Sequence, residues 1–240
     1  MPLYAYYLQA PVSAFDVASV KIGGPIQGDT YNINTGRILH GVLTLGNATL
    51  SDCLKFAYSL TTDAQLAGPE WIREKSYRFD VMAKAAPETP QAQLLMMLRT
   101  LLAERFHIVV HMEQKEMTHY QLVVGKNGPK LTESTVEQDA ARGAARLDGI
   151  TSNRMDMNKF AMLMSRMTRM PVLDRTGLKG AYQVNVQWAP EDPMGKIAEN
   201  PVGPSIFTAF QEQMGLKLES KKGPVEVLVV DHAEKVPVEN

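Results

Sequence analysis

Two kinds of hydrophobic pattern divide the chain. Where apolar and polar residues alternate, the pattern is typical of strands with one buried face. Where apolar residues recur every three or four positions, it predicts helices. Strands are predicted over 15–22, 31–45, 77–83, 107–113, 118–124, 146–155, 182–188, 216–219 and 225–231. Helices are predicted after Asn47, from Pro90 to Arg105, over 157–170 and after Ser205. This mixture predicts the α+β class.

Residues that suit helix ends support these assignments. Pro90 leads into the clearest helix, because proline is well placed at a helix start. Thr49 or Ser51 can cap the first helix, and Ser205 can cap the last, since a hydroxyl oxygen accepts a bond from a free backbone amide. The methionine-rich stretch 155–170 is best interpreted as a helical core stripe.

The order of elements is repeated. The segment 132–145 is polar and alanine-rich, and the pattern that precedes it returns after it. Three pairs of segments match: 66–85 with 172–189, 101–110 with 211–220, and 119–124 with 226–230. We therefore predict an internal duplication of a β-α-β-α-β-β unit, with halves at 1–131 and 146–240, a linker at 132–145 and a pseudo-two-fold axis between the halves. A groove between such halves is a natural place for a ligand.

Composition narrows the possible functions. Of the 240 residues, 45% are hydrophobic and 21% are charged, which indicates a folded globular chain. The formal net charge of -1 lacks the basic footprint of a nucleic-acid-binding protein. No apolar run approaches the roughly 18 residues that span a membrane. The single cysteine, Cys53, excludes an intramolecular disulfide or a multi-cysteine metal site and fits a core position. The oligomeric state is left open.

Several segments together resemble a bacterial family abundant in soil Acidobacteria, of the Solibacter type, whose domain has no assigned function. The matching segments are FDVASVK, GPEW, RFDV, LLAERF, GPKL, PVLDRTGLKGAY, PSIFTAFQEQMGLKLE and PVEVLVVDHAE. The resemblance implies an export signal and an extracytoplasmic location, although the start of this chain shows no intact signal peptide. The family pattern carries a basic residue near His107 and a Pro-Val pair near His119, so both histidines depart from it. The resemblance supplies no catalytic residues.

The densest group of titratable residues follows the long helix. His107, His111 and Glu113 have the same parity, so a regular strand would project them from one face. Glu116 and His119 would approach them across a hairpin. Imidazole and carboxylate groups bind zinc, and a set richer in carboxylates suits calcium. The predicted metal ligands are His107, His111, Glu113 and Glu116, and the predicted catalytic residues are His111, Glu113 and His119. The competing interpretation, a solvated strand face, is the more common outcome.

Two other groups of residues are candidate functional sites. Asp174, Arg175 and Lys179 form a candidate anion-binding turn, because an oriented arginine clamps carboxylates and phosphates; an ordinary turn explains the same residues. Ser205 with Asp231 and His232 contains the residue types of a serine hydrolase, but there is no Gly-x-Ser-x-Gly motif. Nucleotide cofactors are not indicated, because Gly23 and Gly24 are followed by Pro25 and not by a helix.

Two functions from different classes remain. The first is a hydrolase of small esters or lactones in the groove between the halves, with or without the help of a divalent cation. The second is a non-catalytic module that binds a small molecule or a protein in that groove or at an exposed sheet edge. We predict the hydrolase from the sequence, because it makes the sharper claim, and keep the binding module as the alternative.

Overall fold

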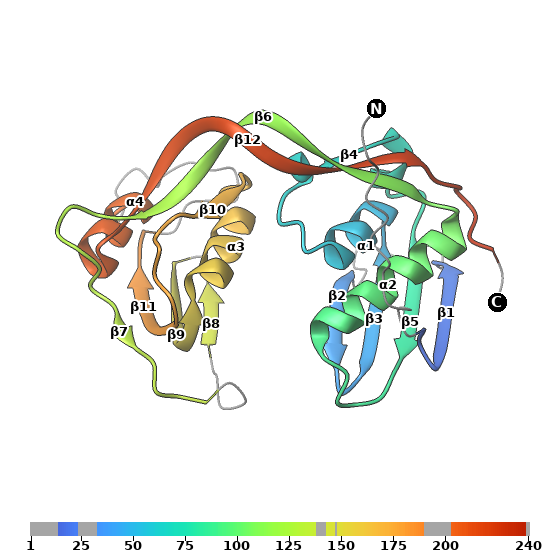
Figure 1. Cartoon of the computed structure of the whole chain (residues 1–240), viewed down its shortest axis with the longest axis horizontal. Coiled ribbons are helices and arrows are strands. Elements are labelled where there is room, and N and C mark those ends of the chain that lie inside the picture. The colour runs from blue at the N-terminus through green and yellow to red at the C-terminus, as the bar shows by residue number, and fades with distance from the viewer. Residues whose placement is uncertain (1–13, 24–32, 138–142, 147, 190–202, 239–240) are drawn as a thin grey trace, which may run out of the picture. The chain divides into compact units, whose positions relative to one another are not determined.

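The computed structural model describes residues 14–23, 33–137, 143–146, 148–189 and 203–238. Helices and sheets are both present (Figure 1), so the predicted α+β class is confirmed. Contacts divide the chain into two compact units. The first contains 1–114 and 226–240, and the second contains 115–225. No described helix is long and apolar enough to cross a membrane.

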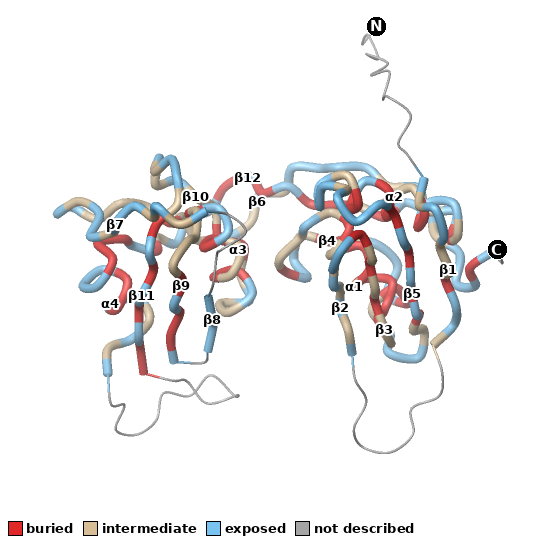
Figure 2. The backbone as a smooth tube through the Cα atoms, turned by 90° about the horizontal axis from the view of Figure 1, so that it is seen from below, coloured by how far each residue is buried: buried red, intermediate tan, exposed pale blue. Residues whose placement is uncertain are grey.

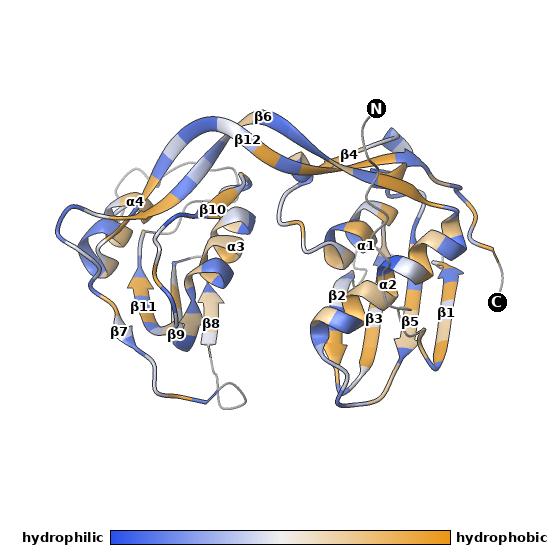
Figure 3. Cartoon of the chain, viewed as in Figure 1, coloured by the Kyte–Doolittle hydropathy of each residue, from blue (hydrophilic) through white to orange (hydrophobic). Residues whose placement is uncertain are grey.

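The first unit contains an antiparallel sheet with strand order β1-β5-β3-β2. Its strands are β1 (Val17–Ile22), β2 (Asn34–Leu39), β3 (Val42–Ala48) and β5 (Phe79–Lys84). Helices α1 (Leu50–Ala57) and α2 (Gln91–Phe106) cover one face (Figure 1). Alternate residues of β5 are buried in the core, and apolar residues predominate in the sheet strands of this unit as Figure 3 colours them. The short η1 (Asp63–Gln65), β4 (Leu66–Ala67) and η2 (Glu70–Arg73) lie between α1 and β5 in the chain.

Helix α1 begins at a complete capping box. The Thr49 hydroxyl accepts a bond from the Asp52 amide at 3.1 Å, and the Asp52 carboxylate accepts one from the Thr49 amide at 3.1 Å. The predicted cap at Thr49 is therefore confirmed. Cys53, one turn into the helix, is buried in the core as expected. Burial, reinforced by the nearby Asp52 carboxylate, raises the pKa of the Cys53 thiol far above its usual range.

The second unit contains a sheet with strand order β7-β11-β9-β8. Its strands are β7 (Thr132–Glu133), β8 (Gly143–Arg146), β9 (Gly149–Asp156) and β11 (Ala181–Gln187). Its helices are α3 (Met157–Thr168), α4 (Ile206–Ala209) and the π-helical turn η3 (Phe210–Met214). The methionine-rich stripe lies in the core, as predicted, with Met157 and Met164 buried beside Phe160.

The stretch expected to be a linker contributes strands to this sheet. Of its described residues, 132–133 form β7 beside β11, and 143–146 form β8 beside β9. Every residue of both strands is exposed, so their pairing depends on backbone hydrogen bonds. The hydrophobic pattern could not reveal such strands, because they bury no apolar side chain.

A third sheet has the strand order β10-β6-β12-β4. Its two long strands, β6 (Val109–Val124) and β12 (Leu216–His232), each pass from one unit into the other. The prediction of two strands in each of these stretches was wrong, because no turn interrupts 114–117 or 220–224. The short β10 (Val172–Asp174) lies parallel to β6, and β4 lies parallel to β12.

Side-chain contacts define how β6 and β12 run past each other. His111 contacts Asp231, and the position of a Cβ on Gly223 would lie 3.3 Å from the His119 ring. The step from 111 to 119 is eight residues forward, and the step from 231 to 223 is eight residues back. Equal and opposite steps are what an unbroken antiparallel pair requires. The predicted hairpin is replaced by one continuous ribbon.

The Cys53 thiol should be inert in the native protein. Burial keeps reagents away from the thiol, and the raised pKa keeps the thiol protonated, so that little reactive thiolate forms. Ellman's reagent should therefore react with Cys53 of the native protein only as fast as the first unit opens. In denaturant it should titrate one thiol per chain. A Thr35→Cys variant supplies an exposed control that reacts at once. Rapid labelling of Cys53 in the folded wild type would show that α1 is not packed as described.

Candidate functional site

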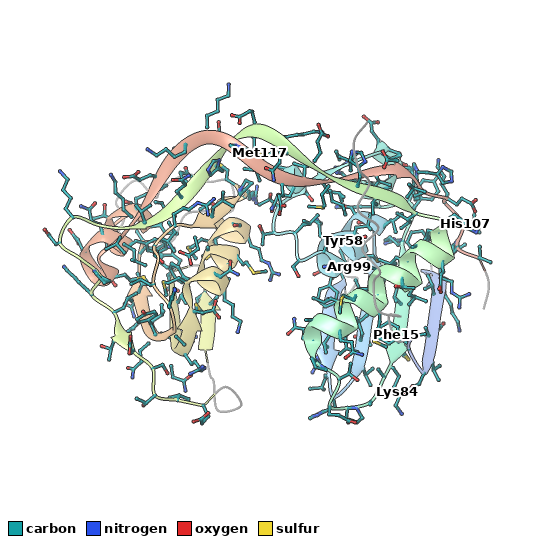
Figure 4. All side chains as sticks on the ribbon, in the orientation of Figure 1. Phe15, Tyr58, Lys84, Arg99, His107 and Met117 are labelled. Carbon is teal, nitrogen blue, oxygen red and sulfur yellow. The ribbon has the colours of Figure 1, made fainter. Side chains whose placement is uncertain are left out.

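His107 does not lie on the strand where it was predicted. It is the C-cap of α2, with φ of 46° and ψ of 44°, and the helix ends there before β6 begins (Figure 4). Its Nδ1 atom lies 3.0 Å from Glu234 Oε2. A left-handed residue ends a helix by turning the chain away from its axis. The prediction that His107 projects from the same strand face as His111 and Glu113 is therefore wrong.

His111 forms a close pair with an acidic residue on the neighbouring strand. Its Nδ1 atom lies 2.7 Å from Asp231 Oδ2, and both side chains are about half exposed. This contact holds the imidazole ring in one orientation and leaves its Nε2 atom available to accept a proton or a ligand. None of the hollows described below includes either residue.

His119 is a buried residue of β6, only 2% exposed. Its Nδ1 lies 3.2 Å from the Met117 carbonyl oxygen, and its Nε2 lies 3.3 Å from Gln121 Nε2. With the Gln121 amide donating to Nε2, Nδ1 carries the proton and donates to the carbonyl. This ring is a satisfied core group, packed against Gly223.

The predicted metal ligands do not come together. Glu113 and Glu116 are exposed on β6, and His107 and His111 each contact a different carboxylate. Within the described ranges, no three or more His, Cys, Asp or Glu residues are arranged to hold a metal ion.

The residues after β10 that were a candidate anion-binding site form an ordinary turn. Asp174 Oδ1 accepts bonds from the Thr176 amide at 2.9 Å and from its hydroxyl at 2.7 Å. The Arg175 amide donates to the Leu122 carbonyl, while the side chains of Arg175 and Lys179 are exposed. The carboxylate therefore stabilises the turn and does not orient the guanidinium.

The residues of a serine hydrolase triad have other partners. Ser205 caps α4, as predicted, by accepting a bond from the Thr208 amide at 3.2 Å. Asp231 contacts His111 instead of an imidazole beside Ser205.

A surface hollow of the second unit lies beside the end of its last helix. It measures about 410 Å³ and is formed by the turn at 125–130, helix α4, the π-helical turn η3 and the start of β12. An adjoining hollow of about 350 Å³ shares three lining residues with it. The larger hollow is lined by Asn127, Lys130, Phe207, Thr208, Gln211, Glu212, Lys217 and Leu218. π-Helical turns inside helices frequently accompany functional sites.

Backbone contacts hold the turn against the end of η3. The Gly125 amide donates to the Gly215 carbonyl, and the Lys130 amide donates to the Met214 carbonyl, each at 2.8 Å. Gly215 has φ of 65°, and a Cβ atom there would lie 2.2 Å from the Gly128 carbonyl oxygen. Only glycine permits this close approach. The shape of the hollow therefore depends on Gly215.

Four of the eight residues that line the hollow carry ammonium or amide groups. Lys130 Nζ donates to the Glu212 carbonyl oxygen at 2.7 Å, and Lys217 Nζ lies 3.1 Å from Glu219 Oε1. The hydrogen bond and charge of Lys217, followed by those of Lys221, lower the pKa of Glu219, so this carboxylate stays ionised at neutral pH. The sequence analysis missed this site, because its lining residues come from separate stretches of the chain, 127–130 and 207–218, and no local pattern joins them.

Replacing Gly215 should disturb the hollow more than replacing Gly128. Both glycines have positive φ, 65° and 78°, so alanine is strained at either by about 1–2 kcal/mol. Only at Gly215 would the new methyl also meet backbone, because nothing lies within 4 Å of a Cβ at Gly128. Thermal unfolding should therefore show a clearly larger loss of stability for Gly215→Ala than for Gly128→Ala. Equal losses would contradict the packing of the turn on η3.

Comparison with known proteins gives a family but no activity. Residues 51–233 match the family described as "Protein of unknown function (DUF3738)". No curated protein and no solved structure matches the chain. The matched region covers most of the chain, including the ribbon of β6 and β12 and the hollow of the second unit. The chain therefore belongs to the DUF3738 family of proteins of unknown function.

Proposed function

We propose that the protein is a non-catalytic module that binds a small anionic molecule in the hollow beside η3. The observation that carries this proposal is the lining of the hollow, where Lys130 and Lys217 accompany the amides of Asn127 and Gln211. Ammonium and amide N–H groups donate to carboxylate and phosphate oxygens. The volume of about 410 Å³ falls in the range typical of small-molecule sites.

The chemistry of the lining favours binding over turnover. Among the described lining residues there is no imidazole or thiol, and the one carboxylate belongs to Glu212. A hydroxyl is present at Thr208, but its partner is Ser205, which is not a base. General acid and base groups within reach of each other are what hydrolysis would need. Phe207, 42% exposed, adds an apolar surface for a ligand's carbon skeleton.

Charge changes around the hollow should alter affinity in opposite directions. With citrate and inorganic phosphate as probes, Lys217→Ala should weaken binding about tenfold by removing a charged donor. Glu219→Gln should strengthen binding, since it releases the Lys217 ammonium from its carboxylate partner. Lys222→Ala, an exposed lysine of the same strand outside the lining, is the matched control. Calorimetry at low and high salt measures all four proteins.

The proposal fails if neither probe binds the wild type, or if the three variants bind as the wild type does. Loss of affinity in Lys222→Ala equal to that in Lys217→Ala would show attraction to the whole surface instead of a site.

A second function, hydrolysis of small esters or lactones, is favoured by one specific observation. The Asp231 carboxylate lies on Nδ1 of His111 at 2.7 Å, which is the arrangement that prepares an imidazole to act as a base through Nε2.

Hydrolysis can be tested directly with chromogenic esters and a lactone, with chelator and with added calcium or zinc. If the His111–Asp231 pair acts as proposed, His111→Ala should lower turnover by about a hundredfold, since base catalysis contributes at least that much. Chelator and added calcium or zinc should leave turnover unchanged, because no described group of His, Cys, Asp or Glu residues is arranged to hold a metal ion. Turnover that is unaffected in folded variants would exclude this pair.

We also propose that the chain is internally duplicated, with the first half at 1–131 and the second at 146–240 extended back to β8, which begins at 143. Two segments have the same element order, β2-β3-α1-β4-β5-α2-β6 and β8-β9-α3-β10-β11-α4-β12. The last helix of each ends at a left-handed residue, His107 or Gly215. The short strands pair reciprocally, β4 with β12 and β10 with β6. Such halves differ from the compact units because the final strand of each half continues into the other unit.

An extracytoplasmic location is a further part of the proposal. It is supported by the resemblance of the sequence to exported proteins.

A further inference from the structure

Among the described residues of the first unit, β1 is an edge strand with little protection against pairing. β1 lies at one edge of the order β1-β5-β3-β2, and its six residues pair with β5 in a regular register. The opposite edge strand, β2, has a register shift between Asn34 and Arg37 that interrupts its ladder. Bulges, prolines and inward charges are the common means of blocking edge pairing. β1 has no proline and one charged residue, Lys21.

The main-chain groups of β1 that face away from β5 can be assigned by alternation. The Gly23 amide donates to the Arg78 carbonyl at 2.7 Å, so Lys21, Ser19 and Val17 also bond toward β5. At the strand start the Asp16 amide also reaches the Lys84 carbonyl, as in a β-bulge. The amides and carbonyls of Ala18, Val20 and Ile22 therefore point outward from the sheet edge.

The side chains along this edge are unusually open for an apolar strand. Val17 is 67% exposed and Ile22 is 63% exposed, although both are aliphatic. Figure 2 shows β1 at the side of its sheet, and its exposed residues lie at the two ends of the strand. Pairing would satisfy the outward main-chain groups and cover Ile22.

We propose that β1 pairs antiparallel with β1 of a second copy of this chain, with Val20 opposite Val20 at the two-fold axis. Ala18 then lies opposite Ile22 of the second copy, and these apolar side chains share the inner face of the combined sheet. Ser19 lies opposite Lys21 of the second copy on the outer face. Hydrogen bonds form between Ala18 and Ile22 in both directions and between the two Val20 residues.

The strand's own sequence favours a second copy over an unrelated segment. An isologous interface needs a surface that is complementary to itself. In this register the apolar residues of β1 meet apolar residues, and the one charge meets a serine and not another charge.

Site-specific crosslinking tests the register. Ser19 and Lys21 of the second copy would form a non-hydrogen-bonded pair with Cα atoms about 4.5 Å apart, within disulfide range. A mixture of Ser19→Cys and Lys21→Cys chains should therefore crosslink under mild oxidation, and each variant alone should crosslink far less. Cys53 is buried and does not compete. Equal crosslinking in the mixture and in the separate variants would overturn this register.

Solution mass tests the association itself. In analytical ultracentrifugation, the wild type should show a monomer–dimer equilibrium as its concentration is raised to about 1 mM, the range in which weak interfaces form. Ser19→Lys should abolish it, since lysine would face Lys21 of the second copy. The exchanged variant Ser19→Lys with Lys21→Ser should restore it, because lysine again faces serine. A monomeric wild type, or a restored variant that stays monomeric while its circular dichroism is native, would overturn the proposal.

Discussion

The pairing of β6 with β12 is the constraint on which the rest of the structure depends. Each strand supplies buried residues to both cores: Val110 and Leu228 pack in the first, and Leu122 and Leu216 pack in the second. The short strands β4 and β10 can be ordered only because the long strands present free edges to them. Backbone hydrogen bonds along the ribbon thus fix where each core begins.

This constraint also explains the fate of the candidate histidines. A ribbon places residues in cross-strand pairs, so His111 meets Asp231 and His119 meets Gly223. Residues at other steps along β6 are kept apart by the spacing of the strand itself, about 3.3 Å per residue. A metal site would need the hairpin that the sequence suggested, and the continuous strand removes it. The hollow beside η3 arises instead where β12 starts from Gly215.

Much of the fold could be predicted from local patterns, whereas the site could not. Thr49 and Ser205 marked helix starts correctly, and the alternation of Phe79 and Val81 located a buried strand. The strands β7 and β8 were missed because they bury nothing, and His107 was misplaced because its left-handed conformation is unusual outside glycine. The hollow requires contact between residues such as Asn127 and Gln211, distant in sequence, which periodicity does not report.

Hydrogen exchange across residues 113–118 of β6 tests the central claim most directly, because these residues include the position where a hairpin turn was expected. A continuous ribbon with β12 predicts slow exchange there, comparable to that of the flanking strand residues 109–112 and 119–122, since their main-chain groups are paired. Fast exchange confined to 113–118, with protection on both sides, would mean that β6 is two strands joined by a turn, and the account of both cores and of the separated histidines would be wrong.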